Sequence, residues 1–128
     1  MAFNGTALLV DDEPHIRKFI GLLLKQLGEP TVIEAGNGEE AIEIYQHKHP
    51  DLVLLDVNMP IMDGIETLRK LMEIDPACTV VMLTSMTNRQ TVDDAAKLGA
   101  TNYLRKDARK EEIIESLQAI VEARFPIE

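Results

Sequence analysis

The sequence predicts an α/β fold: a doubly wound parallel sheet of five strands in the order 2-1-3-4-5, with five helices on its two faces. The main observation is an alternation of short apolar runs, bounded by turn residues, with longer segments whose apolar residues recur at helical spacing. A second observation sets the strand order. The run at 31–35 is the least apolar, which suits a strand at the edge of the sheet.

Each apolar run is short enough for a strand and stops at polar or turn residues. The run before Asp56 consists of Leu and Val alone and is therefore expected to be fully buried. The expected strands are residues 6–10, 31–35, 52–55, 79–83 and 101–104.

The first helix is expected to open at Glu13 and Pro14, because proline is tolerated in a first turn, and to close at Gly28. Leu22 lies off its apolar stripe and is expected to be exposed. The later helices are expected near 39–48, from about Ile65 to the Asp75–Pro76 stop, over 88–98, and along the stripe that runs from 113 to 121.

Composition limits the possible functions. The 128 residues, 45% of them hydrophobic, predict a single domain, 1–128, with no output domain. A net charge of −9 argues against nucleic acid or an anionic membrane as a direct partner. No apolar stretch approaches the ~20 residues of a membrane span, and the lone Cys78 forms no internal disulfide. We therefore expect a cytoplasmic protein.

Polar residues follow the expected strands at the edge where open parallel sheets build their sites. Asp11 and Asp12 follow the first strand, Asp56 the third, Thr84 the fourth and Lys106 the fifth. Three neighbouring carboxylates repel one another unless a cation lies among them, and a site made of oxygen ligands favours Mg²⁺. A hydroxyl and an ammonium group beside the metal suit phosphoryl oxygens.

Together these residues resemble the receiver domain of two-component response regulators, in its single-domain, chemotaxis-type form. The resemblance rests on the acidic pair, the stretch Asp56-Val57-Asn58-Met59-Pro60-Ile61-Met62-Asp63-Gly64, Thr84, Tyr103 and Lys106, and it covers nearly the whole chain. It implies that Asp56 accepts a phosphoryl group from a histidine kinase or a histidine phosphotransfer protein. It also implies that Asp11, Asp12, Asp56 and the backbone carbonyl of Asn58 hold Mg²⁺.

The same resemblance implies that Lys106 and Thr84 bind the phosphoryl oxygens, and that Thr84 and Tyr103 form a switch. The signal would then leave through the face made by the fourth helix, fifth strand and fifth helix, toward a downstream protein. A receiver catalyses only its own phosphorylation and dephosphorylation, and it is a monomer or a phosphorylation-dependent dimer. Asn58 and Met86 would tune the lifetime of the phosphoryl group, and the apolar Met86 predicts slow loss.

One position departs from the family pattern, because Asp107 stands where proline usually follows the lysine in a cis peptide. A cis bond without proline costs ~3 kcal/mol, so we expect a trans Lys106–Asp107 bond and a rearranged loop. We expect Lys106 still to point toward Asp56, Asp107 to cap an early-starting last helix, and the output face to differ from the usual one.

Two alternatives stay open. The missing proline suits a receiver-like interaction module that is not phosphorylated. A Mg²⁺-dependent phosphatase of the haloacid dehalogenase type also uses an Asp after a strand, but it needs a second Asp two residues later, where this chain has Asn58.

Overall fold

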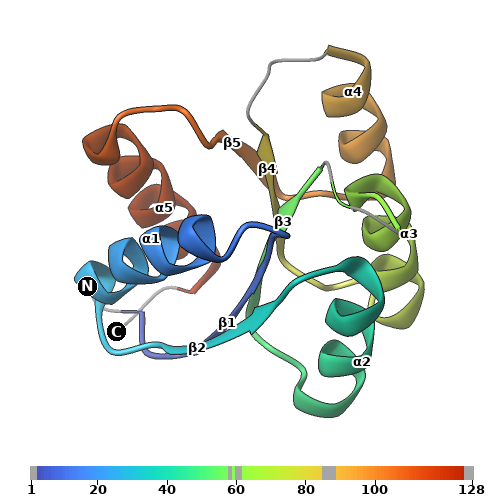
Figure 1. Ribbon diagram of the computed structural model, residues 1–128, viewed down its shortest axis with the longest axis horizontal. Coiled ribbons are helices and arrows are strands. Elements are labelled where there is room, and N and C mark those ends of the chain that lie inside the picture. Colours follow the sequence, from blue (N-terminus) through green and yellow to red (C-terminus); the bar gives the residue numbers. More distant parts are fainter. Residues whose placement is uncertain (1–2, 58, 60–61, 85–88, 126–128) are drawn as a thin grey trace.

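The strands form one parallel sheet in the order β2-β1-β3-β4-β5, as expected from the sequence (Figure 1). The computed structural model describes residues 3–57, 59, 62–84 and 89–125. The strands are β1 (Thr6–Val10), β2 (Thr31–Ala35), β3 (Leu52–Asp56), β4 (Val80–Thr84) and β5 (Asn102–Arg105). The last two are shifted by one residue from the expected bounds, so that Thr84 and Arg105 close their strands.

Helices cover both faces of the sheet, with α1 and α5 on one side and α2, α3 and α4 on the other (Figure 1). Their bounds are α1 (Pro14–Leu24), α2 (Gly38–Lys48), α3 (Gly64–Ile74), α4 (Arg89–Leu98) and α5 (Lys110–Arg124). A short 3-10 turn, Lys25–Leu27, extends α1 to Gly28, whose φ of 154° suits glycine.

Alternate residues of the central strands face opposite helix layers, as the pleat requires. In β1, Leu9 packs in the core cluster that holds α1 and α5, whereas Leu8 and Val10 pack in the cluster that holds α2 and α3. All five residues of β3 are buried, including Asp56. In the order β2-β1-β3-β4-β5, the direction in which successive strands are added to the sheet reverses between β1 and β3. The carboxyl ends of these two strands therefore define the switch point of the sheet.

Two surface expectations have different outcomes. Leu22 is 62% exposed, as expected from its place off the apolar stripe. The expectation that Asp107 caps an early-starting last helix is wrong, because α5 begins at Lys110 with Arg109 as its N-cap residue. Asp107 pairs with Arg105 instead, since a guanidinium two residues away offers the carboxylate two N–H donors.

Within the described residues, no helix combines the length and the apolar character needed to cross a membrane.

Candidate functional site

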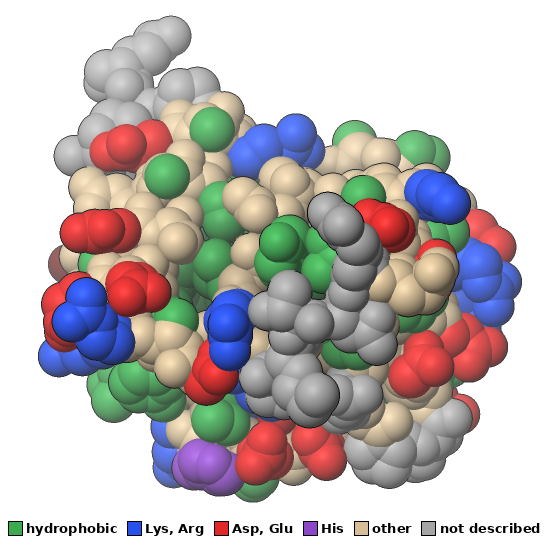
Figure 2. All heavy atoms as spheres, turned by 90° about the horizontal axis from the view of Figure 1, so that it is seen from above, with side chains coloured by type: hydrophobic (Ala, Val, Ile, Leu, Met, Phe, Trp, Pro, Cys, Tyr) green, Lys and Arg blue, Asp and Glu red, His purple; other side chains and the backbone are tan. Residues whose placement is uncertain are grey.

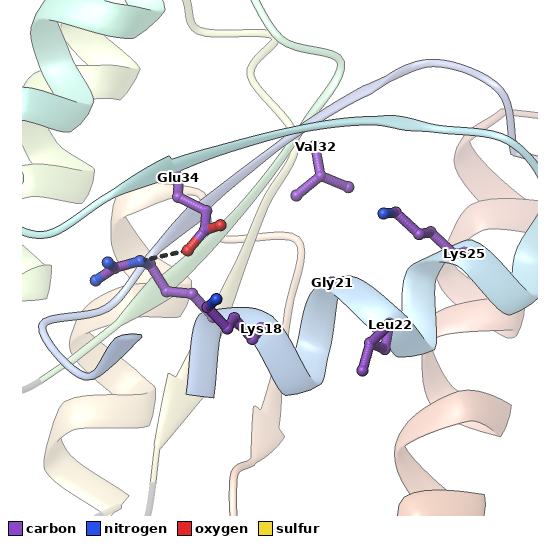
Figure 3. A pocket seen from close by; sticks show the side chains of 7 residues that line it. Lys18, Gly21, Leu22, Lys25, Val32 and Glu34 are labelled. Carbon is purple, nitrogen blue, oxygen red and sulfur yellow. Dashed lines mark hydrogen bonds and ion pairs between the residues drawn. The ribbon is translucent and has the colours of Figure 1, made fainter. Parts of the chain in front are cut away.

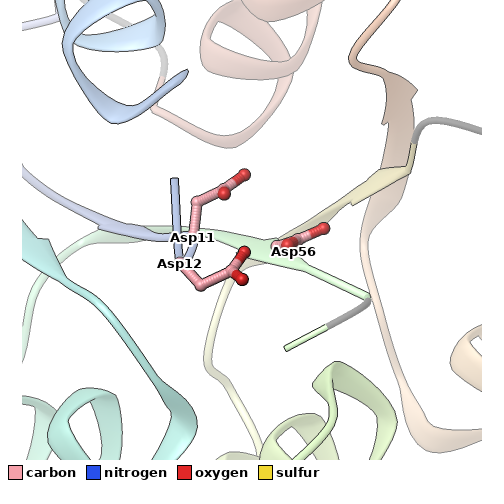
Figure 4. Close-up of side chains that lie close together, drawn as sticks. All are labelled: Asp11, Asp12 and Asp56. Atoms are coloured by element: carbon pink, nitrogen blue, oxygen red, sulfur yellow. The ribbon is translucent and has the colours of Figure 1, made fainter. Parts of the chain in front are cut away.

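The carboxyl ends of β1 and β3 bring acidic side chains together. Val10 is the register partner of Leu55, so Asp11 and Asp56 emerge side by side. Asp11, Asp12 and Asp56 each offer a carboxylate oxygen within 4.8 Å of the others, as expected from the sequence (Figure 4). Asp11 and Asp56 are only 1% and 3% exposed, while Asp12 is open to solvent.

Lys106 reaches this cluster from the end of β5. Its Nζ lies 2.8 Å from Oδ2 of Asp11, 3.4 Å from Oδ1 of Asp56 and 3.4 Å from Oε1 of Glu13. Burial acts to lower the pKa of Lys106, but the carboxylates of Asp11 and Asp56 outweigh it and hold the pKa above its usual value. Lys106 is therefore charged at neutral pH, and it points toward Asp56 as expected.

The cluster still carries more negative than positive charge. Lys106 supplies one positive charge against the three grouped carboxylates, and Glu13 adds another acidic group. Oδ2 of Asp11 is buried, and the contact that the structure gives it is the ion pair with Nζ of Lys106 at 2.8 Å. A buried carboxylate oxygen in this state, beside two more oxygen donors, suits a hard divalent cation. The residues present therefore fit Mg²⁺.

Backbone hydrogen bonds fix the position of Asp11. Its N–H donates to the carbonyl of Ala35 at 3.1 Å, and its Oδ1 accepts from the N–H of Glu13 at 2.9 Å. Arg17 donates to the Asp11 carbonyl and pairs with Glu34 at 2.8 Å. Sequence reasoning missed Arg17, since no local pattern links a helix residue to a strand-end carbonyl. It also read Glu13 only as a helix opener, although a third consecutive acidic residue was a usable signal.

Gly64, at the start of α3, lies close against the end of β3. The N–H of Gly64 donates to the carbonyl of Val57 at 2.8 Å, and the side chain of Asp63 caps α3 by accepting from the N–H of Glu66 at 2.8 Å. A Cβ at position 64 would collide with the carbonyl oxygen of Asp56, so this close return requires glycine.

Asn58 and Met86, for which sequence analysis suggested a metal contact and an effect on phosphoryl lifetime, lie outside the described residues.

Thr84 and Tyr103 lie on neighbouring strands beside the cluster. Thr84 is buried at the end of β4, and Tyr103 on β5 is 42% exposed. Both line a small, mainly apolar pocket, together with Val57, Met82, Thr91, Val92 and Ala95. The arrangement brings the expected switch pair to one pocket, with the Tyr103 ring partly in solvent.

The turn after β5 carries the departure from the family pattern. The Lys106–Asp107 bond is trans, as expected. The N–H of Lys106 donates to the carbonyl of Thr84 at 2.7 Å, which ties the turn to β4.

The face seen from above the sheet has acidic side chains spread around its rim, with basic side chains among them (Figure 2).

Elsewhere, a groove of about 290 Å³ lies between α1 and β2. Lys18 and Leu22 line it from α1, Lys25 lines it from the 3-10 turn that follows, and the Arg17–Glu34 ion pair borders it (Figure 3). The groove contains none of the clustered carboxylates.

A doubly wound sheet that holds an acidic cluster and a buried lysine at its switch point defines a receiver-type α/β domain. The sequence matches the response regulator receiver domain family over residues 7–118, and the chain belongs to that family. It is a domain of two-component signalling.

Two similar proteins agree with the assignment to the receiver domain family. The chain is 41% identical over 114 residues to the nitrate/nitrite response regulator protein NarL of Escherichia coli K12, covering 88% of this chain and 53% of that protein. It thus spans about half the length of NarL. It is 38% identical over 111 residues to the chemotaxis protein CheY of Listeria monocytogenes, covering 87% and 93%.

A solved structure of the CheX–CheY complex with BeF₃ and Mg²⁺, from Borrelia burgdorferi, matches with a TM-score of 0.84 at 29% identity. The match covers 90% of this chain and 87% of that one.

Proposed function

We propose that this receiver domain accepts a phosphoryl group on Asp56 from a histidine kinase or a histidine phosphotransfer protein, in a Mg²⁺-dependent reaction. The observation that carries the proposal is the contact of Lys106 with the buried Asp56 at 3.4 Å, beside Asp11 and Asp12. An ammonium group in this place suits the stabilisation of negative charge on a phosphoryl group bound to that carboxylate.

In the proposed reaction, an oxygen of the Asp56 carboxylate attacks the phosphorus of a phosphohistidine. The P–N bond breaks, an acyl phosphate forms on Asp56, and the donor imidazole leaves with the bond electrons and takes up a proton. Lys106 and the hydroxyl of Thr84 would then bind phosphoryl oxygens as negative charge builds up on them.

Asp11, Asp12, Asp56 and the backbone carbonyl of Asn58 are the proposed Mg²⁺ ligands. Bound there, the metal would neutralise charge on the phosphoryl oxygens and on the cluster itself. The burial of Asp11 and the spacing of the carboxylates support this assignment.

The proposed output follows from Thr84 and Tyr103. If Thr84 turns toward the phosphoryl group, the pocket that both residues line gains room for the Tyr103 ring, which is now 42% exposed. Phosphorylation would thus bias a pre-existing equilibrium of the α4, β5 and α5 face, which a downstream protein reads. The apolar Met86 would slow dephosphorylation, because it cannot orient an attacking water by hydrogen bonding.

The test uses a small phosphoryl donor, acetyl phosphate, with Mg²⁺ and intact mass spectrometry. Wild-type protein should gain one phosphoryl group, and Asp56→Asn should gain none. Asp63→Asn is the matched control, because asparagine can still cap α3 in the same loop, and this variant should react normally.

A wild-type chain that stays unmodified, and whose NMR spectrum does not change with beryllofluoride and Mg²⁺, would instead favour the interaction module. Turnover of a generic phosphoester would favour the phosphatase.

A further inference from the structure

Lys106 lies between two residues that bind each other. Nε of Arg105 donates to Oδ1 of Asp107 at 3.0 Å, and Nη2 donates to Oδ2 at 2.8 Å. The pair is bidentate, which fixes the relative orientation of the guanidinium and carboxylate planes. Asp107 holds the position where the family pattern has proline, so this ion pair occurs where a backbone constraint is otherwise built in.

The ion pair and Lys106 lie on opposite sides of the chain. Arg105 and Asp107 are each about half exposed (51%), whereas the Lys106 side chain is 9% exposed. Because the side chains of Arg105 and Asp107 bind each other on the solvent side, the side chain of Lys106 between them is directed inward. The backbone supports this geometry, since the N–H of Ala108 donates to the carbonyl of Arg105 at 3.3 Å and closes the turn.

We infer that the Arg105–Asp107 ion pair is a positioning device that directs Lys106 at Asp56 in place of the missing proline. Asp107 is therefore a positioning residue, since it touches neither Asp56 nor the acidic cluster, within the contacts that the structure describes. The inference rests on the proposed phosphoryl transfer, because that is the reaction in which the place of Lys106 matters.

The charges of Arg105 and Asp107 suit an ion pair that forms over the whole neutral pH range. Hydrogen bonds from Arg105 hold the pKa of Asp107 below its usual value, so Asp107 carries the negative charge that the pair needs throughout the neutral range. Because both side chains are exposed, the pair adds little to global stability. Its loss should therefore change the rate of phosphorylation more than the melting temperature.

The experiment compares Asp107→Asn, Arg105→Asp with Asp107→Arg in one chain, and Glu73→Gln as a matched control. Glu73 forms a similar exposed ion pair on α3, 3.7 Å from Nη1 of Arg69, and this pair does not flank Lys106. With acetyl phosphate and Mg²⁺, Asp107→Asn should be phosphorylated about two- to fivefold more slowly, the range an exposed ion pair supports. The reversed pair should regain most of the rate, and Glu73→Gln should match wild type.

A Lys106→Ala background tests whether the ion pair acts through the lysine. In that background, Asp107→Asn should not lower the rate of phosphorylation further. The Mg²⁺ affinity and melting temperature of the double variant should equal those of Lys106→Ala alone. An equal loss in both backgrounds would overturn the inference, as would a wild-type rate for Asp107→Asn.

A second measurement needs no phosphoryl donor. ¹³C relaxation of the Lys106 methylene groups should show a more mobile side chain in Asp107→Asn and a restored one in the reversed pair. Unchanged mobility would overturn the inference even if no variant were phosphorylated. Failure of wild type to take up a phosphoryl group would instead count against the proposed function alone.

Discussion

Polar clusters lie at both ends of the same sheet, and they differ in how their charges are balanced. At the carboxyl end, Asp11 and Asp56 are buried against Lys106, whose Nζ lies 2.8 Å from Oδ2 of Asp11. At the amino end, the hydroxyl of buried Tyr45 donates to Oδ2 of Asp75 at 2.8 Å, and Oδ1 of Asp75 accepts from the N–H of Ala77 at 3.0 Å.

The pKa values at the amino end indicate a purely structural cluster. Burial, followed by hydrogen bonds with Cys78 and Asp75, raises the pKa of Tyr45 far above its usual value. The Tyr45 hydroxyl lowers the pKa of Asp75, and burial raises that of Cys78. Each group is thereby held in the protonation state that its neighbours need, a neutral phenol and thiol beside a carboxylate. The carboxyl end, in contrast, keeps like charges together and is stabilised further only by a ligand.

The largest expected difference between the two ends is their response to Mg²⁺. A cation that binds the folded chain at 100 times its Kd adds about 2.7 kcal/mol to the free energy of unfolding, or roughly 10 °C in Tm for a domain of this size. Scanning calorimetry with and without Mg²⁺ should show a shift of this order for wild type.

The metal response should be lost in Asp56→Asn and kept in Tyr45→Phe, because only the first substitution removes a proposed ligand. An equal shift in both variants would mean that Mg²⁺ binds outside the acidic cluster.

Single substitutions in metal-free buffer should have opposite signs at the two ends. Tyr45→Phe removes the hydrogen bond to Asp75 and should lower the free energy of unfolding by about 1 kcal/mol. Asp12→Asn removes a like charge from the cluster and should raise the free energy of unfolding slightly. Urea unfolding in EDTA measures both changes.

Tyr103→Phe is the matched control for Tyr45→Phe, since Tyr103 is 42% exposed whereas Tyr45 is 2% exposed, and the stability of Tyr103→Phe should equal that of wild type. A destabilised Asp12→Asn would show that the acidic cluster is not under repulsion.

The smallest expected effect is on the alkaline pH profile. Lys106 and Tyr45 both have folded-state pKa values above their ordinary values, which are about 10.4 and 10. Their contributions to stability are complete below those ordinary values and are lost as pH rises through the folded-state values. The free energy of unfolding should therefore fall above about pH 10, and less steeply in Tyr45→Phe. Equal slopes in the two proteins would contradict the assignment to Tyr45.

Much of the fold and the placement of the site could be predicted because the decisive signals are local. The weak apolarity of 31–35 put that strand at the edge. Each site residue ends a strand or directly follows one, so the parallel order alone brings Asp11, Asp56 and Lys106 together. The direction of Lys106 also followed, although the proline after it is absent.

The contacts that could not be predicted join residues whose proximity depends on packing. Tyr45 on α2 and Asp75 just after α3 are 30 residues apart, and Arg17 contacts Asp11 from α1. The start of α5 at Lys110 was mispredicted for a related reason. Asp107 is suitable both as a cap and as an ion-pair partner, and the nearby guanidinium of Arg105 decides between the two.

The strand order has a consequence for how the proposed site forms during folding. Lys106 contacts Glu13 across 93 positions, and β5 carries it to the site. Contacts between residues so distant in sequence carry a high entropic cost of chain closure. A chain in which β5 has not yet joined the sheet therefore lacks the lysine beside Asp56. Under the proposed function, the ability to take a phosphoryl group would then depend on the docking of β5.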